Sequence, residues 1–110
     1  MKFKDLFRFE KKEVDLTFQN AKQKDKIEGL KLLQSPNVET AFGKLLIITS
    51  KKVGKAHKRN RIRRQLKSIF YQEKLFQNPI NSIIIVYKQA TDLTFEQLRE
   101  FLIKNFKTND

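Results

Sequence analysis

The segment that decides the fold of this chain reads Ser50-Lys-Lys-Val-Gly-Lys-Ala-His-Lys-Arg-Asn-Arg-Ile-Arg-Arg-Gln-Leu-Lys-Ser-Ile-Phe70. Its apolar residues recur at about 100° per residue, the period of a helix with one buried side. They are Ile62, Leu66, Ile69 and Phe70. Continuous aliphatic runs precede and follow this helix, at 45–48 and 83–86, and are typical of strands buried on both faces. The pattern predicts an α+β fold in which helices pack on a small sheet.

The same segment is strongly basic. From Thr40 to Gln72 the chain carries no acidic residue, although its net charge is +12. Like charges without acidic partners repel one another, so such a run indicates an external polyanion. Phosphate fits best, because each contact releases condensed counterions. A merely solvated helix face is the alternative, but the acids that would form i,i+4 pairs are missing. The charge pattern therefore predicts binding to nucleic acid.

Helical geometry predicts which side chains reach that partner. Asn60, Arg61, Arg64 and Lys67 fall opposite the apolar side, Arg63 lies on a flank, and Arg59 lies nearer the apolar edge. Arginine is prominent among them, and its planar fork grips phosphate oxygens in pairs. With the preceding loop, the predicted RNA contacts are Lys51, Lys52, Lys55, Lys58, Arg59, Asn60, Arg61, Arg63, Arg64 and Lys67.

The remaining chain predicts short, mixed elements: a helix over 10–21, and strands over 26–33 and 42–49 joined at a Ser35-Pro-Asn turn. A further short strand around Gly29 stays open. The last helix begins at a capping box of Thr94 and Gln97, with Leu93 and Leu98 placed as a hydrophobic staple. Its apolar face is Phe95, Leu98, Phe101, Leu102 and Phe106.

Length and composition further limit the possible folds and functions. The 110 residues, 39% of them apolar, predict one packed domain over 1–110. Without cysteine there is no disulfide framework, thiolate nucleophile or zinc ribbon. No apolar run approaches the roughly 20 residues of a membrane span, and no signal-peptide pattern opens the chain. We expect a cytoplasmic protein with no membrane partner.

Two motifs together carry a family resemblance. Ser50-Lys-Lys-Val-Gly54, followed by Ala56-x-x-Arg59-Asn60-Arg61-Ile62-x-Arg64, closely resembles the signature of the bacterial ribonuclease P protein subunit. The resemblance continues through 83–86, Tyr87-Lys88-Gln-Ala90 and Leu93-Thr-Phe-Glu96. It covers roughly 43–106, whereas the first forty residues match only loosely.

The resemblance implies an accessory subunit of a tRNA 5′-processing endoribonuclease. In that family a catalytic RNA removes the 5′ leader of precursor tRNA with Mg²⁺ ions, which are held mainly by the RNA, and the protein assists substrate and metal binding. The catalytic RNA subunit and precursor tRNA are the implied partners, and no small-molecule substrate is implied. The family fold is an α-β-β-β-α-β-α sandwich, like the second domain of a small-subunit ribosomal protein. Its crossover between the third and fourth strands is left-handed, against the general rule.

The resemblance also implies residue roles. It places Arg59, Asn60, Arg61, Arg63 and Arg64 against the catalytic RNA near its metal sites, and puts Lys51, Lys52 and Gly54 in the adjoining loop. A cleft between the first helix and the sheet holds the single-stranded leader. Its implied residues here are Val14, Phe18 and Lys31, at positions where the family often has aromatic rings. Phe18 can stack on a base or pack in the core, whereas Val14 has no ring, which implies a weaker or more electrostatic leader contact.

Other functions remain open on the residues alone. A ribosomal or general RNA-binding protein would explain the charge and the strands, but not the 59–64 spacing together with the 51–54 loop. An independent metal-dependent nuclease needs convergent carboxylates, whereas Asp15, Glu28 and Glu39 are scattered. The single histidine, His57, has no cysteine or nearby acid with which to build a metal or catalytic site, and we expect a polar position on the RNA face. No glycine-rich phosphate loop indicates an NTPase.

Overall fold

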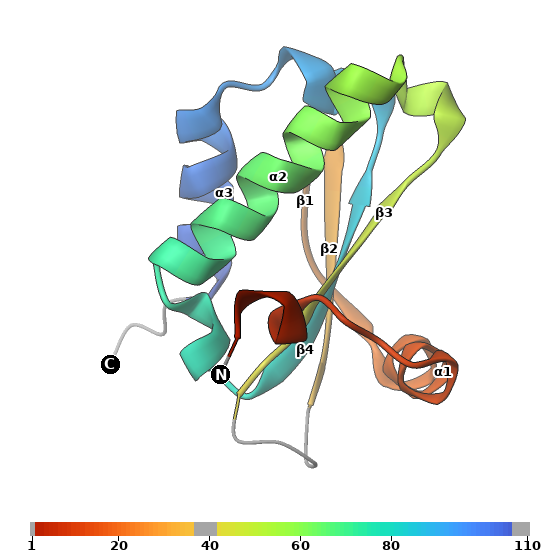
Figure 1. Ribbon diagram of the computed structural model, residues 1–110, viewed down its shortest axis with the longest axis vertical. Coiled ribbons are helices and arrows are strands. Elements are labelled where there is room, and N and C mark those ends of the chain that lie inside the picture. Colours follow the sequence, from red (N-terminus) through yellow and green to blue (C-terminus); the bar gives the residue numbers. More distant parts are fainter. Residues whose placement is uncertain (1, 37–41, 107–110) are drawn as a thin grey trace.

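The two aliphatic runs lie side by side in a four-stranded sheet, which three α-helices flank in the computed structural model (Figure 1). The structure describes residues 2–36 and 42–106. The strands are β1 (Lys22–Ile27), β2 (Leu30–Pro36), β3 (Leu45–Thr49) and β4 (Ile80–Val86). The α-helices are α1 (Lys11–Asn20), α2 (Ala56–Gln72) and α3 (Phe95–Phe106). Short 3₁₀ turns are η1 (Phe3–Leu6), η2 (Lys51–Val53), η3 (Leu75–Gln77) and η4 (Lys88–Asp92).

The sheet has the strand order β1-β2-β4-β3. The β3 and β4 strands are parallel, with Ile47 paired to Ile84, while β1 and β2, and β2 and β4, are antiparallel. Parallel neighbours need a long connection between them, and α2 is that connection. The predicted burial on both faces holds for the central β4, where Ile83 and Ile84 are fully buried. It does not hold for β3, because an edge strand has a neighbour on one side only and most of its residues are half-buried.

Helices cover both faces of the sheet. In Figure 1, α2 and α3 lie on one side of it and α1 on the other. The main core lies under α2 and α3, and the predicted apolar sides of both helices form it. Its fully buried members include Leu32, Leu66, Phe70, Ile84, Leu98 and Leu102. One prediction for α3 is wrong: Phe95 is 38% exposed, because the first residue of the helix projects beyond the core.

The prediction of one strand over 26–33 is wrong. The chain reverses at Glu28 and Gly29, so β1 and β2 form a hairpin and the order becomes α-β-β-β-α-β-α. Gly29 has a φ of 101°, a conformation that favours glycine. A Cβ there would also lie 2.6 Å from the backbone nitrogen of Ala90. The reversal therefore depends on glycine twice, for its backbone angle and for the close approach of η4.

The turn expected at Ser35-Pro-Asn is also wrong where the structure describes it. Ser35 and Pro36 belong to β2 and pair with Asn81 and Ile80, and Asn37 lies outside the described residues. Two other predictions are confirmed. The helix over 10–21 is α1, and the capping box of α3 is formed, with the Thr94 N–H donating to Gln97 Oε1 at 2.8 Å and the Gln97 N–H to Thr94 Oγ1 at 3.1 Å.

Candidate nucleic-acid interface

The basic surface comprises η2, the turn after it, and the outer side of α2. Val53 is buried and anchors η2 in the core, which leaves Lys51 and Lys52 exposed on either side of the chain's path. Gly54 then adopts a φ of 150° and turns the chain into α2. The Lys55 carbonyl accepts the N–H groups of Lys58 and Arg59, which starts the helix. The predicted loop and helix thus form one continuous surface.

The predicted contact residues divide by exposure. The exposed ones are Lys51, Lys52, Lys55, Lys58, Asn60, Arg61 and Arg64, while Arg59, Arg63 and Lys67 are half-buried. His57 is exposed among them, on the surface where we expected a polar residue. The predicted apolar side of α2 is at most 1% exposed at each of its four residues, Ile62, Leu66, Ile69 and Phe70, so the helix is oriented as its periodicity predicted.

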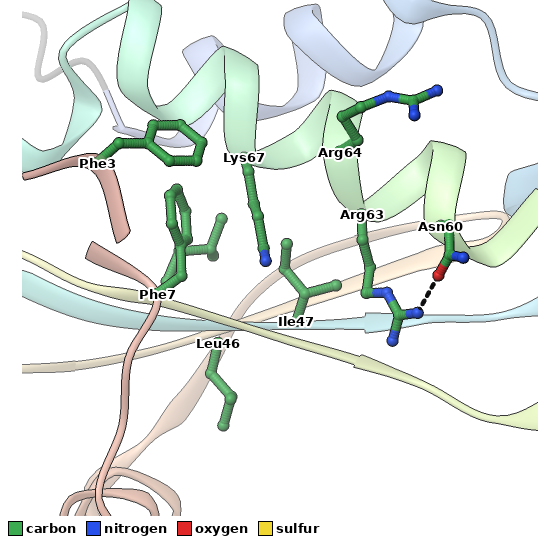
Figure 2. Close-up of a pocket in the computed structure, with 9 residues that line it drawn as sticks. Phe3, Phe7, Leu46, Ile47, Asn60, Arg63, Arg64 and Lys67 are labelled. Carbon is green, nitrogen blue, oxygen red and sulfur yellow. Dashed lines mark hydrogen bonds between the residues drawn. The ribbon is translucent and has the colours of Figure 1, made fainter. Parts of the chain in front are cut away.

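Lys67 is the exception to that orientation. We predicted it opposite the apolar side, but its ammonium lies 5.4 Å from the centre of the Phe7 ring, within a groove between α2, β3 and η1. The predicted position assumed an isolated helix, and the N-terminal segment folds back over this side of α2. Figure 2 shows Phe3 and Phe7 at one end of the groove, Asn60 and Arg63 at the other, and Lys67 between them.

Arg63 is held in a defined position. Its guanidinium donates hydrogen bonds to the Asn60 side-chain oxygen and, at 3.3 Å, to Thr49 Oγ1 at the end of β3. Both acceptors are neutral, so the arginine is oriented while its charge stays uncompensated. Arg61 Nη2 donates at 3.5 Å to the Thr91 carbonyl of η4. Arg59 lies nearer the core, as predicted, and its buried Nε has no hydrogen-bond partner among the described atoms.

Among the described residues, this surface has no acidic partner, in agreement with the sequence. The ion pairs found join Lys44 to Glu13, Arg99 to Glu73 and Glu96, and Lys104 to Asp25. Across residues 2–36 and 42–106, none of them involves a cation between Lys51 and Lys67. Uncompensated cations on one surface create a positive potential that attracts a polyanion.

The second predicted site lies on the other face of the sheet, where α1 packs against β2. Phe18 is 42% exposed, so the structure does not use it as a core residue; Thr17 is the buried residue of α1. Val14 and Lys31 are half-buried. Lys31 pairs in register with Ile85, and Ile85 with Ile48, so an aliphatic row continues from Lys31 across the sheet.

Sequence reasoning missed several residues of both sites. Lys44 counted as one more cation of the basic run, but its Nζ binds Glu13 Oε2 at 2.8 Å and the Arg8 carbonyl at 2.7 Å, which fastens the start of α1 to the sheet. Phe3, Phe7 and Thr49 were not considered. The four-residue spacing of Phe3 and Phe7, beside basic residues, is a signal that pointed to one side of a helical turn. Thr49 had no such signal.

Neither a protein-borne metal centre nor a membrane span is found in the described part of the chain. No three His, Cys, Asp or Glu side chains gather there as a divalent ion would require. Among the same residues no helix combines the length and the apolar character needed to cross a bilayer.

Comparisons with known proteins agree with the motif resemblance. The family model Ribonuclease P matches residues 2–109. The ribonuclease P protein component of Phytoplasma australiense is 36% identical over 97 residues, covering 86% of this chain and 84% of that protein. The corresponding protein of onion yellows phytoplasma is 42% identical over 69 residues, which are 60% of this chain but only 49% of that relative.

Solved structures show the same fold. The Staphylococcus aureus RNase P protein superposes with a TM-score of 0.78 at 22% identity, covering 93% of this chain and 98% of that one. The Thermotoga maritima RNase P protein, solved with 1-(4-fluorophenyl)-2-thiourea, gives a TM-score of 0.77 at 23% identity and covers 94% and 100%. The family match over nearly the whole sequence and the Phytoplasma relative place this chain in the bacterial ribonuclease P protein family, the protein components of the enzyme that processes the 5′ ends of tRNA.

Proposed function

We propose that this chain binds the catalytic RNA of ribonuclease P through the basic surface, and so assists removal of the 5′ leader from precursor tRNA. The observation that carries the proposal is the set of exposed cations on η2 and α2 without an acidic partner in the described residues. Family membership supplies the partner: a protein component of this enzyme works with an RNA. The proposed contacts are Lys51, Lys52, Lys55, Lys58, Arg59, Asn60, Arg61, Arg63, Arg64 and Lys67.

We propose that the precursor-tRNA leader lies on the α1 side of the sheet. Phe18 offers an exposed ring there, and Lys31 offers a cation beside the aliphatic row. Single strands are held by stacking and by cationic grooves, so one ring and one cation predict a modest contact. Val14 contributes apolar surface only. This division gives the protein two RNA-facing sides, separated by the sheet.

Magnesium belongs, in this proposal, mainly to the RNA. The described side chains form no carboxylate cluster for it. The protein contributes by neutralising phosphate near the ions that the RNA holds, because two polyanions must approach closely. For the fold, we propose that α2 makes the left-handed crossover between β3 and β4 that the family resemblance implies, and an experimental structure would check its hand.

A reconstituted cleavage reaction tests the proposal. Precursor tRNA is incubated at low Mg²⁺ with the catalytic RNA of a relative, with this protein, or with both. We expect leader removal to be faster with both than with the RNA alone, and no cleavage with the protein alone. If the catalytic RNA cleaves at the same rate with and without the protein, a general RNA-binding protein would be favoured. Cleavage by the protein alone would favour an independent nuclease.

A further inference from the structure

The groove between α2, β3 and η1 combines two kinds of surface. One end is aromatic: the rings of Phe3 and Phe7 lie 5.0 Å apart, and Phe3 is 43% exposed. The other end is polar and cationic, with Asn60, Arg63 and Lys67, and Ile47 lies between (Figure 2). Its volume is about 570 Å³, within the range of about 300–1,000 Å³ that is usual for small-molecule sites.

None of the described residues that line this groove is acidic. Arg63 and Lys67 therefore present two positive charges to whatever enters it. Thr49 and Asn60 already hold the Arg63 guanidinium, so little ordering remains to be done when an anion binds. The Lys67 ammonium lies against Phe7 and carries no ion pair among the described residues. The cationic end is thus preorganised for an anion such as phosphate.

The aromatic end needs a different explanation, since phosphate has no use for a ring. Phe3 keeps 43% of its surface exposed although it contacts Tyr71 edge-on, with the ring centres 5.2 Å apart. An exposed ring beside uncompensated cations matches single-stranded nucleic acid, in which each phosphate is linked to a flat base. Double-stranded RNA presents phosphates and sugars but keeps its bases stacked inside the helix.

We propose that this groove binds one unpaired nucleotide of an RNA. Its phosphate lies between Arg63 and Lys67, and its base packs against Phe3 and Ile47. The inference rests on the proposed function and refines it, because it makes part of the α2 surface a pocket for a splayed-out nucleotide as well as a phosphate-binding face. Thr49 acts as a positioning residue through its hydrogen bond to Arg63.

Two small ligands separate the base from the phosphate. Adenosine 5′-monophosphate and ribose 5-phosphate carry the same phosphate group and differ only in the base. Titrations followed by NMR at low salt should show the adenosine nucleotide binding at least about fivefold more tightly, as stacking on one ring predicts. The largest shifts should map to Phe3, Ile47 and Arg63.

Three variants test which residues of the groove bind the base and which bind the phosphate. Phe3→Leu should remove most of the preference for the adenosine nucleotide and leave ribose 5-phosphate affinity unchanged. Thr49→Val should weaken both ligands by the same factor, since it releases Arg63 and spares the ring. Phe95→Leu changes a comparably exposed ring, 38% exposed, at the start of α3 and should change neither affinity.

Equal affinities of the two ligands for the wild-type protein, or shifts that map away from the groove, would overturn the inference without need of any variant. A preference that survives in folded Phe3→Leu would do the same. The cleavage reaction keeps this failure separate from failure of the proposed function. A protein that accelerates the catalytic RNA but does not prefer the adenosine nucleotide retains its proposed function and loses only the nucleotide pocket.

Discussion

Arg64 differs from Arg61, Arg63 and Lys67 in having no side-chain hydrogen bond, ion pair or ring contact within the described structure. It is exposed, and Figure 2 shows its side chain directed away from Lys67 and the groove floor. Arg63, one residue earlier, is instead bound to Thr49 and Asn60. Both arginines line the groove, but Arg63 is held by hydrogen bonds, whereas the guanidinium of Arg64 makes none among the described residues.

Arg64→Ala should weaken binding to the catalytic RNA and leave the fold intact. Each lost phosphate contact lowers the slope of log affinity against log salt by about 0.7–0.9. Binding measured over a series of salt concentrations checks both quantities. Lys24→Ala is the matched control, because it removes the same charge from β1, at the sheet edge opposite β3. An unchanged slope and affinity in folded Arg64→Ala would remove this residue from the interface.

Phe18→Leu tests the leader site at the same scale. Leucine keeps an apolar side chain on α1 but removes the flat ring, and stacking of a base on a ring is worth about 1–3 kcal/mol. We expect the complex of the Phe18→Leu protein with the catalytic RNA to bind precursor tRNA more weakly than the wild-type complex does. Mature tRNA, which has no leader, should bind equally well to both complexes. Equal losses for the two tRNAs, or no loss for either, would mean that the leader lies elsewhere.

At the scale of elements, α2 forms part of the core with one side and, in the proposed function, binds RNA with the other. Leu66 is fully buried at the centre of its apolar side. Leu66→Ala should lower the free energy of unfolding by about 2–5 kcal/mol, since it removes buried contacts and leaves a cavity. Arg64→Ala, half a turn away on the exposed side, should change it by no more than about 0.5 kcal/mol. Urea unfolding of both variants checks the order, and the reverse order would mean that α2 is rotated.

The β1 strand is fastened to α3 by one carboxylate. Asp25 Oδ2 accepts a hydrogen bond from the Asn105 amide at 2.9 Å and lies 3.6 Å from Lys104 Nζ. The hydrogen bond from Asn105 is the main cause that lowers the pKa of Asp25 below its ordinary value of 3.8. The Lys26 N–H and the Lys104 ammonium lower this pKa further. A lowered pKa stabilises the fold at pH values above the unfolded-state pKa, and this contribution is lost as pH falls through the folded-state pKa.

Asp25→Asn should therefore be less stable than the wild type at neutral pH and should lose less stability on acidification below about pH 4. Urea unfolding at neutral and strongly acid pH checks both. Asp15→Asn makes the same change at an exposed position of α1 and serves as the control. If the free energy of unfolding changed with pH in the same way for Asp25→Asn and wild type, the link between β1 and α3 would contribute nothing measurable to stability.

At the scale of the whole molecule, the two proposed RNA-binding sites differ in their charge and in the face of the sheet on which they lie. The net charge is +12, and among the described residues the cations of η2 and α2 form no ion pair, while α1 lies on the other face of the sheet (Figure 1). If both sides of the sheet bind RNA, as proposed, the protein holds two polyanions near each other and reduces their mutual repulsion.

Magnesium should partly replace this effect. Divalent ions also screen the repulsion between catalytic RNA and precursor tRNA, so the acceleration due to the protein should be large at low Mg²⁺ and shrink as Mg²⁺ rises. Cleavage rates with and without protein over a magnesium series measure the trend. The Phe18→Leu deficit in precursor binding should persist at high Mg²⁺, because an ion offers no flat ring. A protein benefit independent of magnesium would contradict the electrostatic account.

The sequence by itself determined the elements with strong periodicity or clear chemistry. Ile62, Leu66, Ile69 and Phe70 repeat at the helical period, and the Thr94–Gln97 box is local, so α2 and the start of α3 were predictable from near neighbours alone. The family motif at 50–64 added the order of the elements. The local pattern left the hairpin open, as a further short strand around Gly29, because Glu28 and Gly29 interrupt an otherwise continuous strand pattern only mildly.

Only the tertiary structure decided which residues far apart in the chain share a surface. Phe3 and Phe7 reach Lys67 because η1 folds over α2, and Thr49 reaches Arg63 because β3 is an edge strand beside it. Lys44 looked like another free cation and proved to be paired with Glu13. Periodicity reports only on contacts within a few residues, whereas contacts between distant residues depend on the packing of whole elements. The cationic face could therefore be predicted from the sequence, and the groove within it could not.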